Sequence, residues 1–220
     1  MRDFLEAEGE YTSAKPLYER ALSICEKTLG PYHPHTATSL NNLAVLSERE
    51  GSYAAARPMH ERALSIREET LGPYHPDTAN SLNNLAALCK AEGDYASARR
   101  LCKRALSIRE ETLGPYHPDT AHSLNSMAGL YAAEGDYTSA RRLCKRALLI
   151  CEENLGSSHP ETAASLNNLA ELCKAEGDYA SARPLYERAL SIRESRLGPG
   201  HPDTRSTAKQ LALLKETQEK

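Results

Sequence analysis

The sequence repeats itself every 42 residues, and this periodicity limits the fold more than any other feature. One set of glycines recurs at this spacing, and a second set stands three residues before a His-Pro pair in every unit. The first set is Gly9, Gly51, Gly93, Gly135 and Gly177, and the second is Gly30, Gly72, Gly114, Gly156 and Gly198. Residues 51–92 and 93–134 share 30 identities over 42 aligned positions. Because one short unit cannot bury its own apolar residues, successive units must stack and share a core.

This repeat predicts a single array over residues 1–220, with units that begin near residues 9, 51, 93, 135 and 177. Residues 1–8 then correspond to a partial helix from a preceding unit. The last helix, about residues 203–218, is more polar and would cap the stack. We expect the chain to be a fragment of a larger protein, because its first unit lacks most of one helix.

Each unit has the signals of two helices. In residues 77–113, Asp77 or Thr78 can cap the start of the first helix, and leucines and alanines then recur at helical spacing. Gly93 ends this helix in the left-handed conformation that glycine adopts most readily, and Asp94 caps the second helix. Gly114 and the proline after it stop the second helix. The sequence therefore predicts an all-α fold.

Composition excludes several classes of protein. The net charge is −3, which disfavours a nucleic-acid partner, since such binding needs a basic surface. No apolar run approaches 18 residues, so we expect no membrane-spanning segment. The 6 cysteines are irregularly spaced among helix-forming residues, as is typical of a reducing compartment, and we expect a cytoplasmic protein. The sequence suggests no cofactor.

The small and aromatic residues of each unit resemble the tetratricopeptide-repeat signature. In residues 82–106 this signature is Leu82, Leu85, Ala86, Cys89, Gly93, Tyr95, Ala98, Cys102, Ala105 and Leu106. The 42-residue length, and Ala86 where the family commonly has glycine, are similar to the long-repeat subgroup typified by kinesin light chain. The resemblance implies a right-handed α-solenoid of stacked antiparallel helix pairs, whose first helices line a concave groove.

Residues that could carry chemistry have a simpler structural interpretation. The sequence has no phosphate-binding loop, no HExxH and no GxSxG motif, so we expect no enzymatic activity and no catalytic residue. Four cysteines stand at core positions without the spacing of a zinc site, and we expect no metal: Cys89, Cys102, Cys144 and Cys173. Cys25 and Cys151 instead replace arginines, and we expect them to be exposed.

The repeated His-Pro pairs leave two alternatives open. The histidines could act together as a pH sensor, because imidazole titrates near neutral pH. Alternatively, each imidazole ties its loop to the next unit by a hydrogen bond. Repetition at every joint favours the structural alternative.

The most informative surface is one face of the first helices. Placed at 100° steps, polar and small residues fall opposite the leucines of the core. The candidate peptide-binding residues on this face are Asn41, Asn42, Arg49, Asn80, Asn83, Asn84, Ala87, Lys90, His122, Asn125, Gly129, Asn167, Asn168, Glu171 and Lys174. The asparagines are nearly constant between units, whereas the other positions vary. Asparagine can bond a peptide backbone, but it can equally bond a neighbouring helix, and both roles remain open.

Two functions from different classes compete. The first is a non-enzymatic scaffold that binds a protein or peptide ligand in the groove that the resemblance implies. The second is a structural or sensor array within a signalling protein, in which units self-associate end to end. The apolar stripe on residues 11–29, which lacks a complete partner helix, supports the second.

Overall fold

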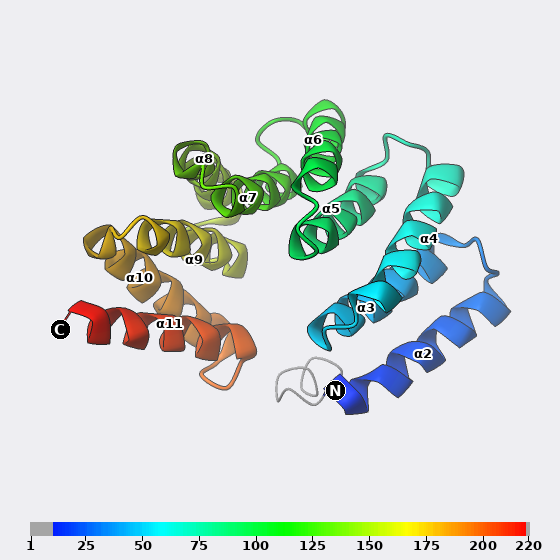
Figure 1. Ribbon diagram of the computed structural model, residues 1–220, viewed down its shortest axis with the longest axis horizontal. Helices are drawn as coiled ribbons and strands as arrows, with labels where there is room; N and C mark the ends of the chain where they lie inside the picture. Colours follow the sequence, from blue (N-terminus) through cyan, green and yellow to red (C-terminus); the bar gives the residue numbers. More distant parts are fainter. Residues whose placement is uncertain (1–10, 219–220) are drawn as a thin grey trace. The chain divides into compact units, whose positions relative to one another are not determined.

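The computed structural model describes residues 11–218, which form ten helices and no strand (Figure 1). The predicted all-α fold is therefore confirmed for this part of the chain. The partial helix expected over residues 1–8 and the glycine at position 9 lie outside the described residues. The chain divides into two compact units, Met1–Gly114 and Pro115–Lys220, and each is described by itself.

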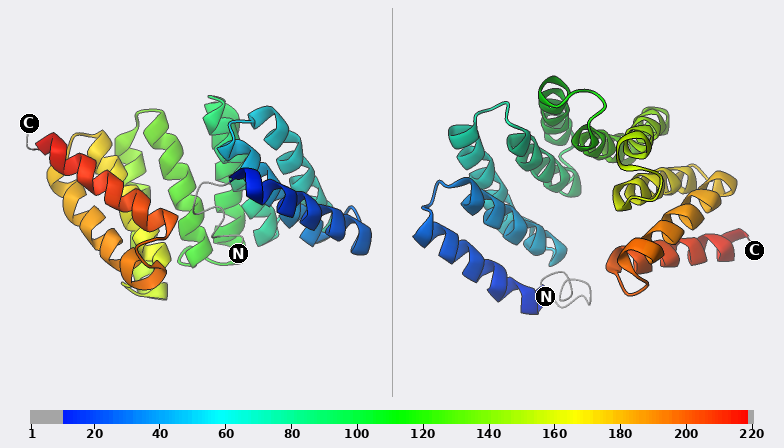
Figure 2. Two further views of the ribbon diagram at one scale, coloured as in Figure 1. Left: turned by 90° about the horizontal axis from the view of Figure 1, so that it is seen from below. Right: turned by 180° about the vertical axis from the view of Figure 1, so that it is seen from behind.

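Both units alternate first helices, which begin with proline, and second helices, which begin with tyrosine. Unit 1 contains α2 (Tyr11–Thr28), α3 (Pro34–Arg49), α4 (Tyr53–Leu71), α5 (Pro76–Ala91) and α6 (Tyr95–Thr112). Unit 2 contains α7 (Pro118–Ala133), α8 (Tyr137–Leu155), α9 (Pro160–Ala175), α10 (Tyr179–Leu197) and α11 (Pro202–Gln218). Within each unit, every helix packs against the helix that follows it, as Figure 2 shows for α2 to α6 and for α7 to α11.

Histidine caps the first helices, and the prediction that Asp77 or Thr78 does so is wrong. The Nδ1 atom of His75 accepts a hydrogen bond from the backbone N–H of Asp77 at 3.1 Å, and Pro76 is the first helical residue. The same bond recurs at His33, His117, His159 and His201. Each imidazole therefore caps its own helix, and the expectation that it ties the loop to the next unit is also wrong.

The predicted start of the second helices and the predicted glycine turns are confirmed. The Asp94 carboxylate accepts a hydrogen bond from the backbone N–H of Ser97 at 3.0 Å. Gly93, just before it, has a φ of +83°, which a residue with a Cβ adopts only with strain. The turn between first and second helix is therefore set by one glycine and one capping carboxylate.

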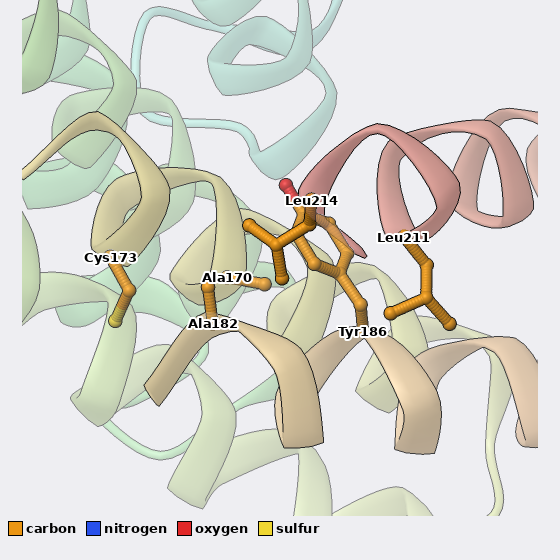
Figure 3. Packing of buried hydrophobic residues seen from close by; sticks show 6 residues of the cluster. All are labelled: Ala170, Cys173, Ala182, Tyr186, Leu211 and Leu214. Atoms are coloured by element: carbon orange, nitrogen blue, oxygen red, sulfur yellow. The ribbon is translucent and has the colours of Figure 1, made fainter. Parts of the chain in front are cut away.

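The second helices α4, α8 and α10 each lie between two first helices of their own unit and supply core residues to both. In unit 2, Ala140 and Cys144 of α8 pack against Ala128 of α7 and also against Leu169 and Leu172 of α9. The next joint repeats this arrangement around Tyr186 of α10, whose ring points toward Leu211 and Leu214 of α11 (Figure 3). The cysteines expected in the core are buried there.

The histidine caps lead to the first prediction. We expect His75→Ala to lower the free energy of unfolding by about 1 kcal/mol, because the backbone N–H of Asp77 loses its acceptor. His75→Asp keeps an acceptor at the cap and should stay within about 0.5 kcal/mol of the parent protein. Denaturant unfolding followed by circular dichroism measures both. Equal losses in the two variants would contradict the capping role.

Candidate functional site

The first helices are joined partly by arginines buried beneath their N-terminal turns. Arg67 of α4 donates to the Asp77 carbonyl at 3.0 Å, to Ser81 Oγ at 2.9 Å and to Thr38 Oγ1 at 3.0 Å. It therefore connects α3, α4 and α5, and burial lowers its pKa. Arg193 makes the equivalent bonds to the Asp203 carbonyl and to Thr207.

The two cysteines at these arginine positions differ from each other. Cys151 is buried, with its Sγ atom 3.5 Å from Ser165 Oγ, so the expectation that it is exposed is wrong. Cys25 is half-buried, and Ser39 Oγ donates to its Sγ atom at 3.4 Å. Both sulfurs therefore contact the serine or threonine position that Arg67 and Arg193 bond in their own joints.

One row of asparagines, the inner row, is used for contacts between first helices. It consists of Asn41, Asn83, Asn125 and Asn167. Asn41 Nδ2 donates to Ser81 Oγ at 3.0 Å, and Asn125 Nδ2 donates to Ser165 Oγ at 3.1 Å. Asn167 Oδ1 accepts from Thr207 Oγ1 at 3.2 Å, and Asn83 is buried. In this row the bond to a neighbouring helix, one of the two roles left open by the sequence, is the one observed.

A second row, the outer row, consists of Asn42, Asn84 and Asn168. The first two are half-buried and Asn168 is exposed. Within residues 11–218 their side-chain amides make no hydrogen bond. Each amide can therefore donate and accept without breaking a contact that holds the fold.

Some of the other predicted residues of this face are hydrogen-bonded within the fold, and the rest are exposed or half-buried. Asn80 accepts a hydrogen bond from Arg109 and donates to Asp77 Oδ1 at 3.2 Å, so its amide is engaged. Lys174 Nζ donates to Gln210 Oε1 of α11 at 2.6 Å. The remaining predicted residues are exposed or half-buried: Arg49, Ala87, Lys90, His122, Gly129 and Glu171.

Sequence reasoning missed His60, which occupies a core position of α4. The same position holds tyrosine or cysteine in the other units: Tyr18, Cys102, Cys144 and Tyr186. His60 is fully buried, and its Nδ1 and Nε2 atoms lie 2.8 Å from Asn41 Oδ1 and 2.7 Å from Glu48 Oε1. Aligning the units would have shown one histidine at a position that otherwise holds only tyrosine or cysteine.

The hydrogen bonds around His60 show that its Nδ1 atom is the donor to Asn41. Asn41 uses its Nδ2 group on Ser81, so its Oδ1 atom accepts and His60 Nδ1 donates. His60 Nε2 lies 2.7 Å from a carboxylate oxygen of Glu48 on the other side of the ring. The inner row is thereby connected through His60 to a carboxylate that is partly open to solvent.

The described residues assemble no cluster that could bind a metal ion, and their buried cysteines are poorly reactive. No group of three histidine, cysteine or acidic residues in residues 11–218 is arranged to hold a metal ion. Burial raises the pKa of the Cys102 and Cys144 thiols to about 11, which makes both poor nucleophiles at neutral pH. None of the helices within the same residues has the length and apolar character that crossing a membrane requires.

Comparison with known proteins finds a family and a fold. The family model described as tetratricopeptide repeat matches residues 3–57, 44–111, 81–134, 123–195 and 169–220. No curated protein matches the chain. A crystal structure of a kinesin light chain-like protein of Podosopora anserina, with nearly identical TPR-like repeats, is 28% identical with a TM-score of 0.62. The match covers 88% of this chain and 92% of that one. BtubC (BKLC) from P. vanneervenii is also 28% identical, with a TM-score of 0.66 over 90% of this chain and 78% of its own.

The two asparagine rows should respond differently to substitution. We expect Asn125→Ala to lower the free energy of unfolding by about 1–2 kcal/mol, because Ser165 loses its partner in a packed joint. Asn84→Ala removes an amide that bonds nothing in the described residues and should change stability by less than about 0.5 kcal/mol. Parallel denaturation of the two variants measures this difference. A similar loss in both would show that the outer row is also structural.

His60 should be costly to remove. We expect His60→Ala to destabilise the protein by about 3 kcal/mol, since it leaves the Oδ1 atom of Asn41 without its donor and opens a cavity in the α3–α4 core. His35→Ala, at an exposed histidine of α3, is the control and should cost less than about 0.5 kcal/mol. Denaturation midpoints compare the two. If the His60→Ala variant were as stable as the His35→Ala control, a structural role for the contact between His60 and Asn41 would be contradicted.

Proposed function

Because the chain belongs to the tetratricopeptide repeat family, we propose that it is a non-enzymatic scaffold that binds a protein or peptide on the exposed face of its first helices. Tetratricopeptide repeats are in general protein–protein interaction scaffolds. The observation that carries the proposal is the difference in hydrogen bonding between the two asparagine rows. The inner row joins helices, whereas Asn42, Asn84 and Asn168 keep unused amides at repeated positions.

The chemistry of these amides suits an extended peptide segment. A carboxamide offers both donors and an acceptor, which match the N–H and C=O groups of a peptide backbone. In unit 1, Asn42 and Asn84 stand at equivalent positions of α3 and α5, the two first helices of that unit. Such a pair would hold a ligand backbone at two points without specifying its side chains.

Selectivity would come from the neighbouring positions that vary between units. Ala87 is exposed and leaves room beside Asn84 for a large ligand side chain. Lys90 is half-buried and has no acidic partner within residues 11–218. Glu48 of α3, at the position equivalent to Lys90 of α5, brings a carboxylate that is partly open to solvent to the same face of unit 1. The ligand that fits this surface has mixed charge, with an acidic residue beside Lys90.

A peptide selected from a library against the intact protein tests the proposal. We expect Asn42→Ala combined with Asn84→Ala to weaken the binding of that peptide by about five- to a hundredfold, since each hydrogen bond contributes about 0.5–1.5 kcal/mol. Both residues lie in unit 1, so the test does not depend on the placement of the other unit. Fluorescence titration measures affinity, and thermal denaturation of the same samples confirms that the variant is folded.

Lys103→Ala provides the matched control, because Lys103 is exposed on the second helix α6 and away from the proposed face. Its affinity for the selected peptide should equal that of the parent protein. Lys90→Ala should weaken binding of peptides that carry an acidic residue more than of those that lack one. Unchanged affinity in the double asparagine variant, with stability intact, would overturn the proposal.

A further inference from the structure

The outer face of α8, in the interior of unit 2, carries a stripe of exposed side chains. Arg142, Lys145 and Leu149 follow one another at spacings of three and four residues, so they lie on one side of the helix. All three are exposed, and Leu149 is 49% exposed. The core residues of α8, among them Ala140 and Cys144, lie on the opposite side. The stripe therefore faces solvent rather than the joints with α7 and α9.

The two cations of the stripe replace uncharged and acidic residues of other second helices. In α10 the position of Lys145 holds Glu187, whose carboxylate lies 2.9 Å from Arg183 Nε. The position of Arg142 holds Pro184 there. Arg142 and Lys145 have no acidic partner within residues 11–218. Because like charges three residues apart on a helix repel each other, this arrangement is unfavourable for α8 alone and favourable for contact with carboxylates.

The leucine of the stripe replaces a serine that the other second helices share. In α4 this serine, Ser65, donates through Oγ to Glu69 Oε1 at 2.8 Å. Leu149 cannot donate, and the Glu153 carboxylate, one turn further along α8, has no hydrogen bond or ion pair in the described residues. The leucine therefore replaces a polar contact within the helix by apolar area that faces water and that a partner can cover. The serines at this position are Ser23, Ser65, Ser107 and Ser191.

The order of charges along the stripe favours a protein helix over a membrane surface. Glu153 is exposed at the C-terminal end of the stripe, where its carboxylate would face the anionic headgroups that Arg142 and Lys145 attract. From Arg142 to Glu153 the stripe extends about 17 Å along the helix axis. A second helix alongside α8 can present acidic, apolar and basic side chains at matching three- and four-residue spacings.

We propose that the outer face of α8 binds an amphipathic helix of a partner protein, with carboxylates opposite Arg142 and Lys145, an apolar side chain against Leu149 and a cation near Glu153. This contact uses a second helix and none of the outer-row asparagines, so it stands or falls separately from peptide binding on the first helices. The helix α6 has cations at the same positions, but Ser107 stands where α8 has Leu149, so α6 lacks the apolar anchor.

Selection from a library of displayed helical peptides against the parent protein supplies the probe. Counter-selection against a variant that combines Lys145→Glu and Leu149→Ser removes peptides that bind elsewhere, including those on the first helices. We expect the enriched peptides to carry acidic residues on the same side of the helix as an apolar residue. If no peptide is enriched, the proposal is wrong.

The affinity of an enriched peptide for single variants locates the contact. Leu149→Ser should weaken binding about five- to tenfold, because the exposed half of this leucine is what the partner covers. Lys145→Glu should weaken binding about tenfold and reduce its dependence on salt concentration. Asn42→Ala combined with Asn84→Ala should leave binding unchanged. Equal affinity for the parent protein and for Leu149→Ser would overturn the proposal.

The similarity between α6 and α8 allows the site to be moved within the chain. In the Leu149→Ser background, Ser107→Leu should restore the affinity for the peptide, because α6 already exposes Arg100 and Lys103. Ser191→Leu in α10, which lacks both cations, is the matched control and should restore nothing. Restoration by both variants, or by neither, would contradict the roles assigned to the leucine and the cations.

Vesicles that contain phosphatidylserine test the membrane alternative. We expect the parent protein not to sediment with them at physiological salt. Sedimentation that Leu149→Ser abolishes would assign the stripe to a membrane surface and overturn the proposal. Circular dichroism and thermal denaturation of each variant confirm that a loss of binding is not a loss of the fold.

Discussion

The second helices α4, α8 and α10 are each covered by two first helices of their own unit, and the stability of both units depends on this sharing. Tyr186 shows the consequence, because its ring is buried only where Ala170 of α9 and Leu214 of α11 meet around it. A helix pair taken alone would leave one side of its second helix in water. Added units therefore stabilise their neighbours by burying apolar area that is already present.

Much of this arrangement could be predicted, because it depends on local backbone conformation at turns and caps and on the spacing of apolar residues along the helices. Gly93 and Asp94 fix a turn through local geometry, which a sequence shows directly. The histidine caps were missed because an imidazole two residues before the capped N–H can replace the usual Asp or Thr, and spacing alone does not distinguish them. The residues Arg67 and His60 were missed for a different reason. Their burial depends on partners 10 to 29 residues away on other helices or in other turns, which helical periodicity does not reveal.

The two asparagine rows differ in function because adjacent residues of a helix point about 100° apart. Asn41 faces α5 and is drawn into the joint, whereas Asn42 points away from it and bonds nothing in the described residues. Both rows recur at 42-residue spacing, although Ser126 interrupts the outer row, so repetition by itself could not assign their roles. Only the three-dimensional contacts separate an amide that holds helices together from one that is available to a ligand.

Regularity and variation therefore have separate physical origins on this face. The positions that join helices change little between units, since a change at one joint disturbs the packing of two first helices at once. Where one does change, as at Cys25 and Cys151, the sulfur contacts the same serine position that arginine bonds elsewhere. Positions such as Ala87, Gly129 and Glu171 are exposed or half-buried and carry no such restriction, so successive units can differ there without loss of stability. An array of this kind can change what it contacts, one unit at a time, while the joints between its helices stay the same.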